Sequence, residues 1–474
     1  SARQPDPDLD PVDDIWTIDV AGTGEERPQP VRLTSTEAGH LGPSFSPDGH
    51  RLAYLANQWS AARPGYYHSR LEVLDLDSRQ VTKLALDLDR SLFPYGDGRP
   101  PVWDGDDLLV SLEDRGSVQV LRVAADGSLT RVVQGKRVVT GWDLAGGTLA
   151  FTATDATHPA ELFSLVGGSE RRLTHHQDAF LRAVPALAPE RFSVRTRDGK
   201  EELDAWLLRP PGFEPGKKYP ALLTIHGGPA TQYAERWFDE FQFLAGAGFI
   251  VFWTNPRGGS GVTEAFGRAI ISPKSSVDPG SGWGGVDYED LMTVTDAVLE
   301  REPAIDRTRM GVLGGSYGGY MTSWIVGHTD RFAAGCSERA VNNLLSEEWS
   351  SDVAGGFQWE VGVDPLEDPD EYLRMSPITY VKEMKTPLLI IHSEEDWRCP
   401  IEQADCLFVA LRRLKRDVEY YRFTAESHEL SRSGSPKHRV QRADLIVEFF
   451  RRRLGLAEQQ GRTEEQQEVA KAAS

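Results

Sequence analysis

Hydrophobic positions follow two different patterns along the chain. Between about residue 15 and residue 175, short runs of β-type residues alternate with clusters of turn-forming residues. After about residue 220, short and continuously apolar runs alternate with longer stretches of helical periodicity. This change predicts an antiparallel β domain followed by an α/β domain, with a boundary near residue 185.

Four similar segments divide the β domain into repeats. They are PVRLT, QVTKLA, LTRVV and ERRLT, and their last residues lie 51, 48 and 41 positions apart, close to the length of a four-stranded propeller blade. Asp48-Gly49 and Asp126-Gly127 supply the glycine that tight hairpin turns require. The pattern predicts about three and a half β-propeller blades over residues 15–185.

The first repeat is shorter than the other three. Before its terminal segment it holds only one further β-type run, at 15–20, which follows an acidic segment at 1–14. An incomplete propeller would leave an unpaired sheet edge, so we expect this chain to be a fragment whose missing blades precede Ser1 or belong to a separate polypeptide. A small β-sandwich with an irregular start is the alternative.

The second part of the chain has the texture of a mostly parallel sheet with helices on both faces. A hairpin at 192–210 opens it, and a polar tail at 457–474 follows it, so we assign residues 186–456 to this domain. Continuous apolar strands of this kind are buried on both faces. The predicted strands are 221–225, 249–253, 310–313, 388–391 and 418–423, and the predicted helices are 288–299, 319–328, 401–414 and 443–454.

A candidate nucleophile lies between a predicted strand and a predicted helix. Strand 310–313 runs into Gly314-Gly315-Ser316-Tyr317-Gly318, a G-x-S-x-G turn. Such a turn needs glycines because larger side chains would collide with the adjoining strand and helix. The pattern predicts an α/β-hydrolase fold with Ser316 as the nucleophile, and a glycine-rich turn with an idle serine is the alternative.

The base that activates this serine should follow it in the chain. The order of catalytic residues in α/β-hydrolases is Ser, then Asp or Glu, then His. His428 follows the last predicted strand in a loop, where a catalytic base is expected, whereas the other three candidates fit a helix, a buried strand end and a basic surface. The candidates are His328, His392, His428 and His438.

The acid that orients the base should follow the strand at 388–391. Three carboxylates, Glu394, Glu395 and Asp396, come directly after this strand, at the sheet edge where catalytic loops gather. The residues alone leave all three open.

Two backbone N–H groups are candidates for an oxyanion hole. Strand 221–225 ends in His226-Gly227-Gly228-Pro229, which resembles the H-G-G loop that supplies one donor, and the residue after the nucleophile supplies the other. We assign the donors to Gly228, with Gly227 as the fallback, and to Tyr317.

Composition removes several classes of function. With 52 Lys+Arg against 72 Asp+Glu, the net charge of −20 argues against nucleic-acid binding. The chain has no apolar run long enough to cross a membrane, and its three cysteines cannot form a disulfide framework, which favours a cytoplasmic location. The motif at 280–285 satisfies G-x-G-x-x-G but follows no strand, so we expect no dinucleotide binding. His175 and His176 have no partnering cluster, so we expect no metal site.

Several motifs follow one another in order along the second part of the chain. They are HGGP at 226–229, NPRGGSG at 255–261, WGGVDYEDL at 283–291, GGSYGGY at 314–320, SPITYV at 376–381, HSEEDWRCP at 392–400 and SHELSRSG at 427–434. Together they resemble the prolyl oligopeptidase family of serine peptidases, and within it the acylaminoacyl-peptidase branch, and the resemblance covers residues 192–455.

The resemblance implies a function and a complete set of catalytic residues. It implies Ser316 as nucleophile, His428 as base and Asp396 as acid, in a hydrolase domain that a propeller closes. The substrates would be short peptides, most simply cleaved after an N-acylated first residue, without a cofactor. Oligopeptidase or dipeptidyl-type cleavage, an esterase and a non-catalytic propeller scaffold are the alternatives, and a homo-oligomer stays open. Apolar residues that follow Ala340 would line the substrate pocket, namely Phe357, Trp359 and Val361.

Overall fold

The structure is a computed structural model that describes residues 13–20, 28–34, 38–57, 65–353 and 356–456. Most of the acidic segment at 1–14 and the whole tail at 457–474 lie outside these residues. Within them, no helix has both the length and the apolar character needed to cross a bilayer.

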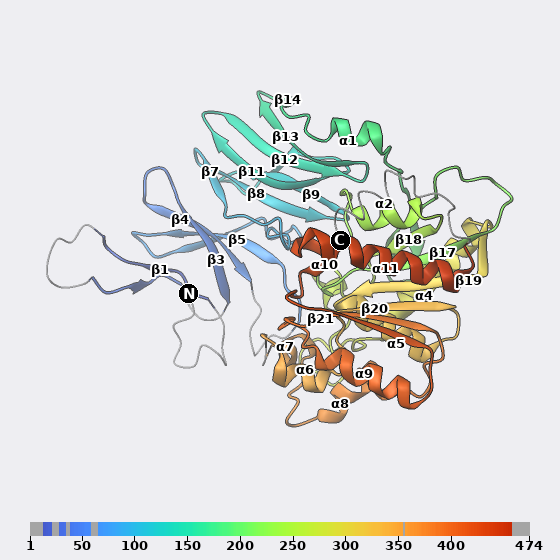
Figure 1. Cartoon of the computed structure of the whole chain (residues 1–474). Coiled ribbons are helices and arrows are strands. Elements are labelled where there is room, and N and C mark those ends of the chain that lie inside the picture. Colours follow the sequence, from blue (N-terminus) through green and yellow to red (C-terminus); the bar gives the residue numbers. More distant parts are fainter. Residues whose placement is uncertain (1–12, 21–27, 35–37, 58–64, 354–355, 457–474) are drawn as a thin grey trace.

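The N-terminal region consists of antiparallel sheets that follow one another along the chain (Figure 1). The first repeat forms only a two-stranded pair, β1 and β2, whereas each later repeat contains four strands. The last two repeats join where β11 pairs with β9 at Val138 and Val118. The strands are β1 (Trp16–Thr17), β2 (Val31–Arg32), β3 (Gly39–Phe45), β4 (Arg51–Asn57), β5 (Ser69–Asp75), β6 (Val81–Leu84), β7 (Val102–Asp104), β8 (Asp107–Asp114), β9 (Ser117–Val123), β10 (Leu129–Val133), β11 (Val138–Ala145), β12 (Thr148–Asp155), β13 (His158–Val166) and β14 (Ser169–Arg172).

The C-terminal domain is built on one eight-stranded sheet in the order β15-β16-β18-β17-β19-β20-β21-β22. The strands from β18 to β22 pair in parallel, and β15 and β16 are antiparallel at one edge. This confirms the predicted mostly parallel sheet. The strands are β15 (Glu190–Arg195), β16 (Glu202–Leu208), β17 (Tyr219–Ile225), β18 (Ile250–Thr254), β19 (Ile305–Gly315), β20 (Ala334–Glu338), β21 (Leu388–Ser393) and β22 (Val418–Phe423).

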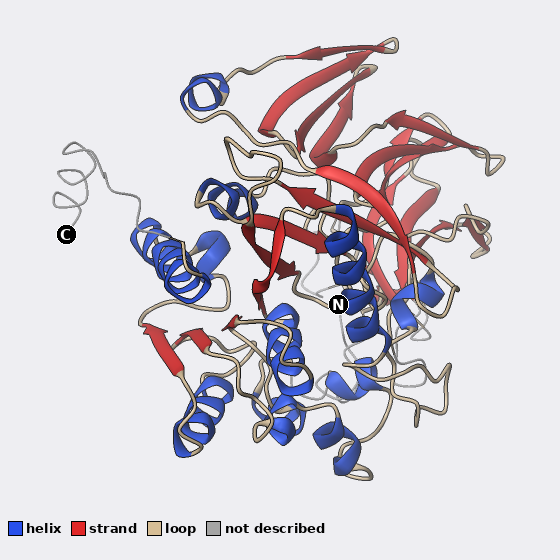
Figure 2. Cartoon of the chain, turned by 90° about the vertical axis from the view of Figure 1, so that its right-hand side faces the viewer, coloured by secondary structure: helices blue, strands red, loops and turns tan. Residues whose placement is uncertain are grey.

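Helices gather around this second sheet and not around the N-terminal strands (Figure 2). A short helix, α1, lies between the two regions of the chain. The helices are α1 (Asp178–Ala183), α2 (Asp239–Gly246), α3 (Glu264–Arg268), α4 (Val286–Arg301), α5 (Tyr317–His328), α6 (Leu344–Ser350), α7 (Phe357–Val361), α8 (Pro369–Arg374), the 3₁₀ helix η1 (Pro377–Tyr380), α9 (Glu402–Arg413), α10 (Leu430–Ser433) and α11 (Pro436–Leu454).

The alternation of side chains along each central strand builds a separate core on each face of the sheet. Leu223 and Ile390 belong to the core that α4, α5 and α9 cover. Their neighbours Leu222 and Leu389 belong to the core that α2 and α11 cover. All four side chains are buried, which explains why these strands are continuously apolar in the sequence.

The N-terminal region contacts the C-terminal domain through the β8–β9 hairpin. The N–H of Arg115 donates to the carbonyl of Gly261 at 2.8 Å, and the N–H of Glu235 donates to the carbonyl of Gly116 at 2.7 Å. The buried hydroxyl of Ser260 donates to Glu113 at 2.9 Å. The hairpin therefore lies on the loops that follow β17 and β18, at the carboxyl edge of the parallel strands.

A buried ionic cluster ties α11 to the sheet behind this edge. Arg442 of α11 bonds both carboxylate oxygens of Glu338, at 2.6 and 2.5 Å, and Glu240 of α2 at 2.6 Å. Burial raises the pKa of Glu338, but the charges of Arg442 and Arg339 outweigh burial and hold this pKa at about 2. Because the folded pKa lies below the ordinary value of 4.5, this stabilisation is present above that value and is lost as the pH falls toward 2.

Removing Arg442 should destabilise the domain severely. We expect Arg442→Met to lower the free energy of unfolding by about 3–5 kcal/mol, because two buried carboxylates lose the arginine that binds both of them. Urea denaturation followed by tryptophan fluorescence measures the change. The matched control is Arg452→Met on the same helix, where Arg452 pairs with Glu419 at the surface and should contribute about 1 kcal/mol or less. Equal effects of the two variants would contradict this account.

Candidate active site

Ser316 lies in a strained turn between β19 and α5. Its backbone has φ +61° and ψ −124°, a conformation that few residues other than glycine adopt. Its N–H donates to the carbonyl of Glu338 at 3.0 Å. The strain places the side chain at the end of the strand and the start of the helix, as a nucleophile on such a turn requires.

The glycines that flank Ser316 are required by close approach of backbone. A Cβ on Gly314 would lie 2.6 Å from the carbonyl oxygen of Ile225, and a Cβ on Gly318 would lie 2.2 Å from the same atom. Both distances are too short for real atoms. The turn therefore packs directly against the end of β17, which brings Ser316 to the loop that starts at His226.

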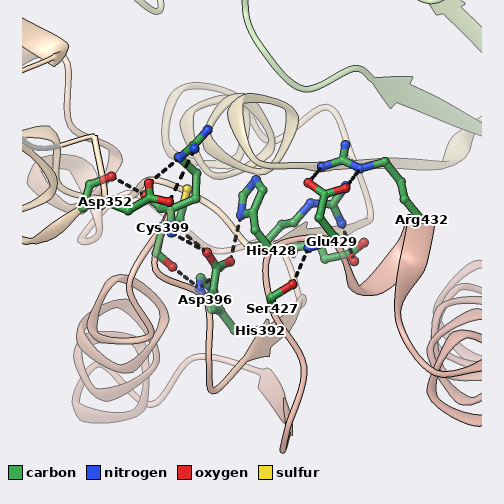
Figure 3. Close-up of polar contacts among 12 residues, drawn as sticks. Asp352, His392, Asp396, Cys399, Ser427, His428, Glu429 and Arg432 are labelled. Atoms are coloured by element: carbon green, nitrogen blue, oxygen red, sulfur yellow. Dashed lines mark hydrogen bonds and ion pairs between the residues drawn. The ribbon is translucent and has the colours of Figure 1, made fainter. Parts of the chain in front are cut away.

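His428 and Asp396 form a hydrogen-bonded pair in the loops that follow β22 and β21 respectively. His428 Nδ1 lies 2.8 Å from Asp396 Oδ2, and the imidazole points toward this carboxylate in Figure 3. The other oxygen of Asp396 accepts the backbone N–H groups of Arg398 at 3.0 Å and Cys399 at 2.9 Å. These bonds fix the carboxylate, so Asp396 can hold the orientation of the imidazole.

The two other carboxylates of the same loop lie elsewhere. Glu394 and Glu395 are exposed, and Glu394 pairs with Arg422 at 3.0 Å. Asp396 is buried. Among the three acids that the sequence left open, the structure brings only Asp396 to His428.

The other three histidines make their shortest polar or ring contacts elsewhere, although His392 Nε2 also lies 3.6 Å from Asp396 Oδ2. His328 lies against Trp324, with ring centroids 4.1 Å apart, and His438 Nδ1 lies 2.6 Å from Glu426. Burial lowers the pKa of His392, and its Nε2 lies 2.7 Å from the carbonyl of Cys399. None of these contacts involves Ser316.

Ser316 and His428 border the same residue, Glu338. The backbone carbonyl of Glu338 accepts the Ser316 N–H, and His428 is close enough to act on the Glu338 carboxylate electrostatically. Among the described hydrogen bonds there is none between the Ser316 hydroxyl and His428. Catalytic hydrogen bonds are often long without substrate and shorten in the Michaelis complex.

The predicted oxyanion loop lies directly beside the serine. A Cβ on Gly227 would lie 3.4 Å from Ser316 Cβ and 3.2 Å from the carbonyl of Gly315, so the Gly227–Gly228 peptide borders the nucleophile. The Gly227 carbonyl accepts the Thr231 hydroxyl at 2.7 Å. Among the backbone hydrogen bonds of the described residues, none is donated by the N–H groups of Gly228 or Tyr317, so both can donate to a substrate oxygen.

The three predicted pocket residues lie in α7. Phe357 is 8% exposed and Val361 is 0% exposed, and both belong to the core of the C-terminal domain. The side chain of Trp359 lies outside the described part of the structure. The placement of Phe357 and Val361 favours packing, and their contact with substrate stays a prediction.

The sequence reasoning missed two arginine–carboxylate pairs near the site. Figure 3 shows Glu429 and Arg432 of one pair beside His428, and Asp352 of the other pair on the side of Cys399. Arg398 donates to Asp352 at 2.5 Å, and Arg432 pairs with Glu429. Tyr95 of the N-terminal region is 72% exposed and lies near both arginines. Arg398 follows Asp396 closely in the sequence, but only the fold brings Tyr95 of the N-terminal region near Arg398.

The described residues contain no group of three or more His, Cys, Asp or Glu side chains that could hold a metal ion. Ser316, His428 and Asp396 are arranged as in a serine hydrolase of the α/β-hydrolase class. The serine lies on a strained turn, and the buried carboxylate holds the histidine.

Comparisons with known proteins assign the chain more narrowly. Residues 236–457 match the model of the prolyl oligopeptidase family. The chain is 35% identical to the uncharacterized peptidase YuxL of Bacillus subtilis, over 89% of this chain and 72% of that protein. It is 27% identical to dipeptidyl-peptidase 5 of Porphyromonas gingivalis, over 81% of this chain and 55% of that protein. The chain belongs to the prolyl oligopeptidase family and is a serine peptidase.

A solved structure has the same architecture. The acylaminoacyl peptidase of Pyrococcus horikoshii superposes with a TM-score of 0.80 at 29% identity, covering 92% of this chain and 66% of that one. The predicted fold class, an α/β-hydrolase domain with N-terminal propeller-type sheets, is confirmed.

Replacing the acid tests its assignment. We expect Asp396→Asn to lower kcat by about 10⁴-fold, because the amide cannot hold the tautomer of His428 that leaves Nε2 free to act as a base. Steady-state kinetics on a chromogenic peptide measures the loss. Glu394→Gln and Glu395→Gln on the same loop are the controls and should keep kcat within about twofold of wild type. A large loss in either control, with Asp396→Asn active, would reassign the acid.

Proposed function

We propose that the chain hydrolyses short peptides through an acyl-enzyme, with Ser316 as nucleophile, His428 as general base and Asp396 as the orienting acid. The observation that carries the proposal is the 2.8 Å contact between His428 Nδ1 and Asp396 Oδ2, at the sheet edge that also holds the strained turn of Ser316. Because Asp396 accepts a hydrogen bond from the Nδ1–H of His428, Nε2 carries no proton and can accept one from serine.

The reaction follows from these roles. Ser316 Oγ attacks the peptide carbonyl while His428 Nε2 takes its proton, and the N–H groups of Tyr317 and Gly228 donate to the oxyanion. His428 then gives the proton to the leaving amine. Water, activated by the same histidine, attacks the acyl-enzyme and releases Ser316.

We propose N-acylated residues at the start of short peptides as the substrates. The similarity to the P. horikoshii acylaminoacyl peptidase supports this substrate class. The charges beside His428 agree with it, because Asp352 and Glu429 already pair with Arg398 and Arg432. A neutral acyl carbonyl can accept hydrogen bonds from the exposed N–H groups of these arginines, whereas a free ammonium needs a carboxylate without a cationic partner.

Dipeptidyl cleavage is the second candidate. Its support is the similarity to dipeptidyl-peptidase 5 of P. gingivalis. An enzyme of that type would have to bind a free amino terminus close to the nucleophile, and the two candidates therefore differ in the charge they accept at the substrate's first residue.

A pair of chromogenic substrates separates the candidates. We expect kcat/KM for acetyl-alanyl p-nitroanilide to exceed that for alanyl-alanyl p-nitroanilide by at least about tenfold at about pH 8, because the arginines favour a neutral acyl group. Ser316→Ala is the control and should lower both values by at least about 10⁴-fold.

The reverse preference would assign dipeptidyl cleavage. Hydrolysis of p-nitrophenyl acetate with neither anilide cleaved would contradict peptide hydrolysis and favour an esterase. Retained turnover in Ser316→Ala would show that the nucleophile is misassigned.

A further inference from the structure

The segment at 280–291 contains a glycine-rich motif and buried charges that the catalytic roles above do not use. Its Gly284 lies against Trp324, so a Cβ there would come within 2.2 Å of the indole ring. The segment then enters α4, whose first turn carries Asp287. Trp324 belongs to α5, the helix that starts directly after Ser316. The contact of Gly284 with Trp324 therefore places the segment against α5.

Asp287 makes its strongest contact with the side chain of Tyr317. The Tyr317 hydroxyl donates to Asp287 Oδ2 at 2.6 Å. The same carboxylate accepts the backbone N–H groups of Gly284 at 3.1 Å and Tyr288 at 2.9 Å. Asp287 and Tyr317 are both buried, so this bond is shielded from water.

Aromatic rings enclose the Tyr317 ring on the remaining sides. Trp283 meets it edge-on with centroids 5.1 Å apart, Tyr320 stacks at 5.7 Å and His226 lies at 6.4 Å. Burial and the Asp287 charge raise the pKa of the Tyr317 phenol, so this phenol stays protonated and remains a donor. One hydrogen bond and three ring contacts thus fix this side chain.

The backbone of Tyr317 is the part of this residue that borders the reaction. Tyr317 is the first residue of α5, where the N–H has no partner within the helix. This N–H lies in the peptide plane between Ser316 and Tyr317, which ψ of Ser316 and φ of Tyr317 orient, and the fixed side chain of Tyr317 restrains this φ. A group that holds the ring therefore also holds the N–H direction.

We propose that Asp287 is a positioning residue of the oxyanion hole, which holds the Tyr317 N–H in the direction that transition-state binding requires by binding the Tyr317 hydroxyl. The inference rests on the proposed function, in which the Tyr317 N–H binds the oxyanion. Asp287 acts through Tyr317 and touches no substrate.

The charge of Asp287 makes the effect dependent on pH. Burial raises the pKa of Asp287 to about 6, although the bonds from Tyr317, Gly284 and Tyr288 oppose burial. The charged or titratable side chains that face it are Asp290 on α4, whose charge adds to the rise, and Tyr317 and Tyr320 on α5. Protonation below about pH 6 weakens the acceptor for the Tyr317 hydroxyl, because a neutral carboxyl is a poorer acceptor than a carboxylate.

The test compares kcat and KM of Asp287→Asn with those of wild type between about pH 5 and pH 8. We expect Asp287→Asn to lower kcat by about tenfold at pH 8 and to change KM by less than about twofold, since the lost interaction acts in the transition state. The ratio of the two kcat values should approach one near pH 5, where wild type has also lost its carboxylate.

Two further measurements exclude a merely structural effect. Tyr317→Phe removes the same bond from the other side, so the double variant should be no slower than either single variant. A peptidyl trifluoromethyl ketone, which forms an oxyanion on the serine, should bind Asp287→Asn about tenfold more weakly than wild type. Met292→Leu, a buried change on the same helix, is the control and should leave all three readouts unchanged.

The inference would be overturned if the fall in kcat of the double variant equalled the product of the falls in the two single variants. A wild-type kcat in Asp287→Asn at pH 8 would also overturn it. A lower kcat and a higher KM together with a lowered melting temperature in every variant would also overturn it, because they would show a general loss of packing. Retained activity in Ser316→Ala would instead overturn the proposed function, and the two failures are thereby distinguishable.

Discussion

The backbone of Ser316 is the constraint on which the rest of the site depends. Its positive φ is tolerated because Gly314 and Gly318 allow the turn to pack against the backbone of Ile225. That contact brings the end of β17 beside the end of β19, and with it the Gly227–Gly228 peptide beside the nucleophile. A single tight turn therefore determines where the serine, one oxyanion loop and the first N–H of α5 lie relative to one another.

Groups behind the turn hold it from several directions. The carbonyl of Glu338 accepts the Ser316 N–H, and the carboxylate of the same residue is bound by Arg442. On the other face, Asp287 binds the side chain of Tyr317. The apolar sheet supplies a rigid support, and the buried charges at its carboxyl edge orient the few polar groups that chemistry needs.

The sequence predicted those parts of the fold that have a local signature. The central strands β17, β18 and β21 and the second half of β19 are buried and largely apolar on both faces, so their positions could be recognised from the chain alone. Strand β20, Ala-Gly-Cys-Ser-Glu, was missed because its residues are small or polar, and only its burial between β19 and β21 makes it a central strand.

The residues of the candidate active site also differ in whether the sequence alone could reveal them. Ser316 and His428 have local signals, a strand–turn–helix motif and a loop after the last strand. The choice among Glu394, Glu395 and Asp396 does not, since it depends on a tertiary contact with a residue about 30 positions away. The Asp287–Tyr317 bond and the place of Tyr95 could not be predicted either, because each joins segments that only folding brings together.

The central claim is that Ser316 is acylated with the help of His428, and covalent labelling tests it most directly. A diphenyl phosphonate ester of an acetylated aminoacyl analogue should add one phosphonyl group to the protein. Peptide mapping by mass spectrometry should locate it on Ser316, and the labelling rate should fall by at least about 10³-fold in His428→Ala. Labelling at another residue, or unchanged labelling of Ser316 without His428, would contradict the account.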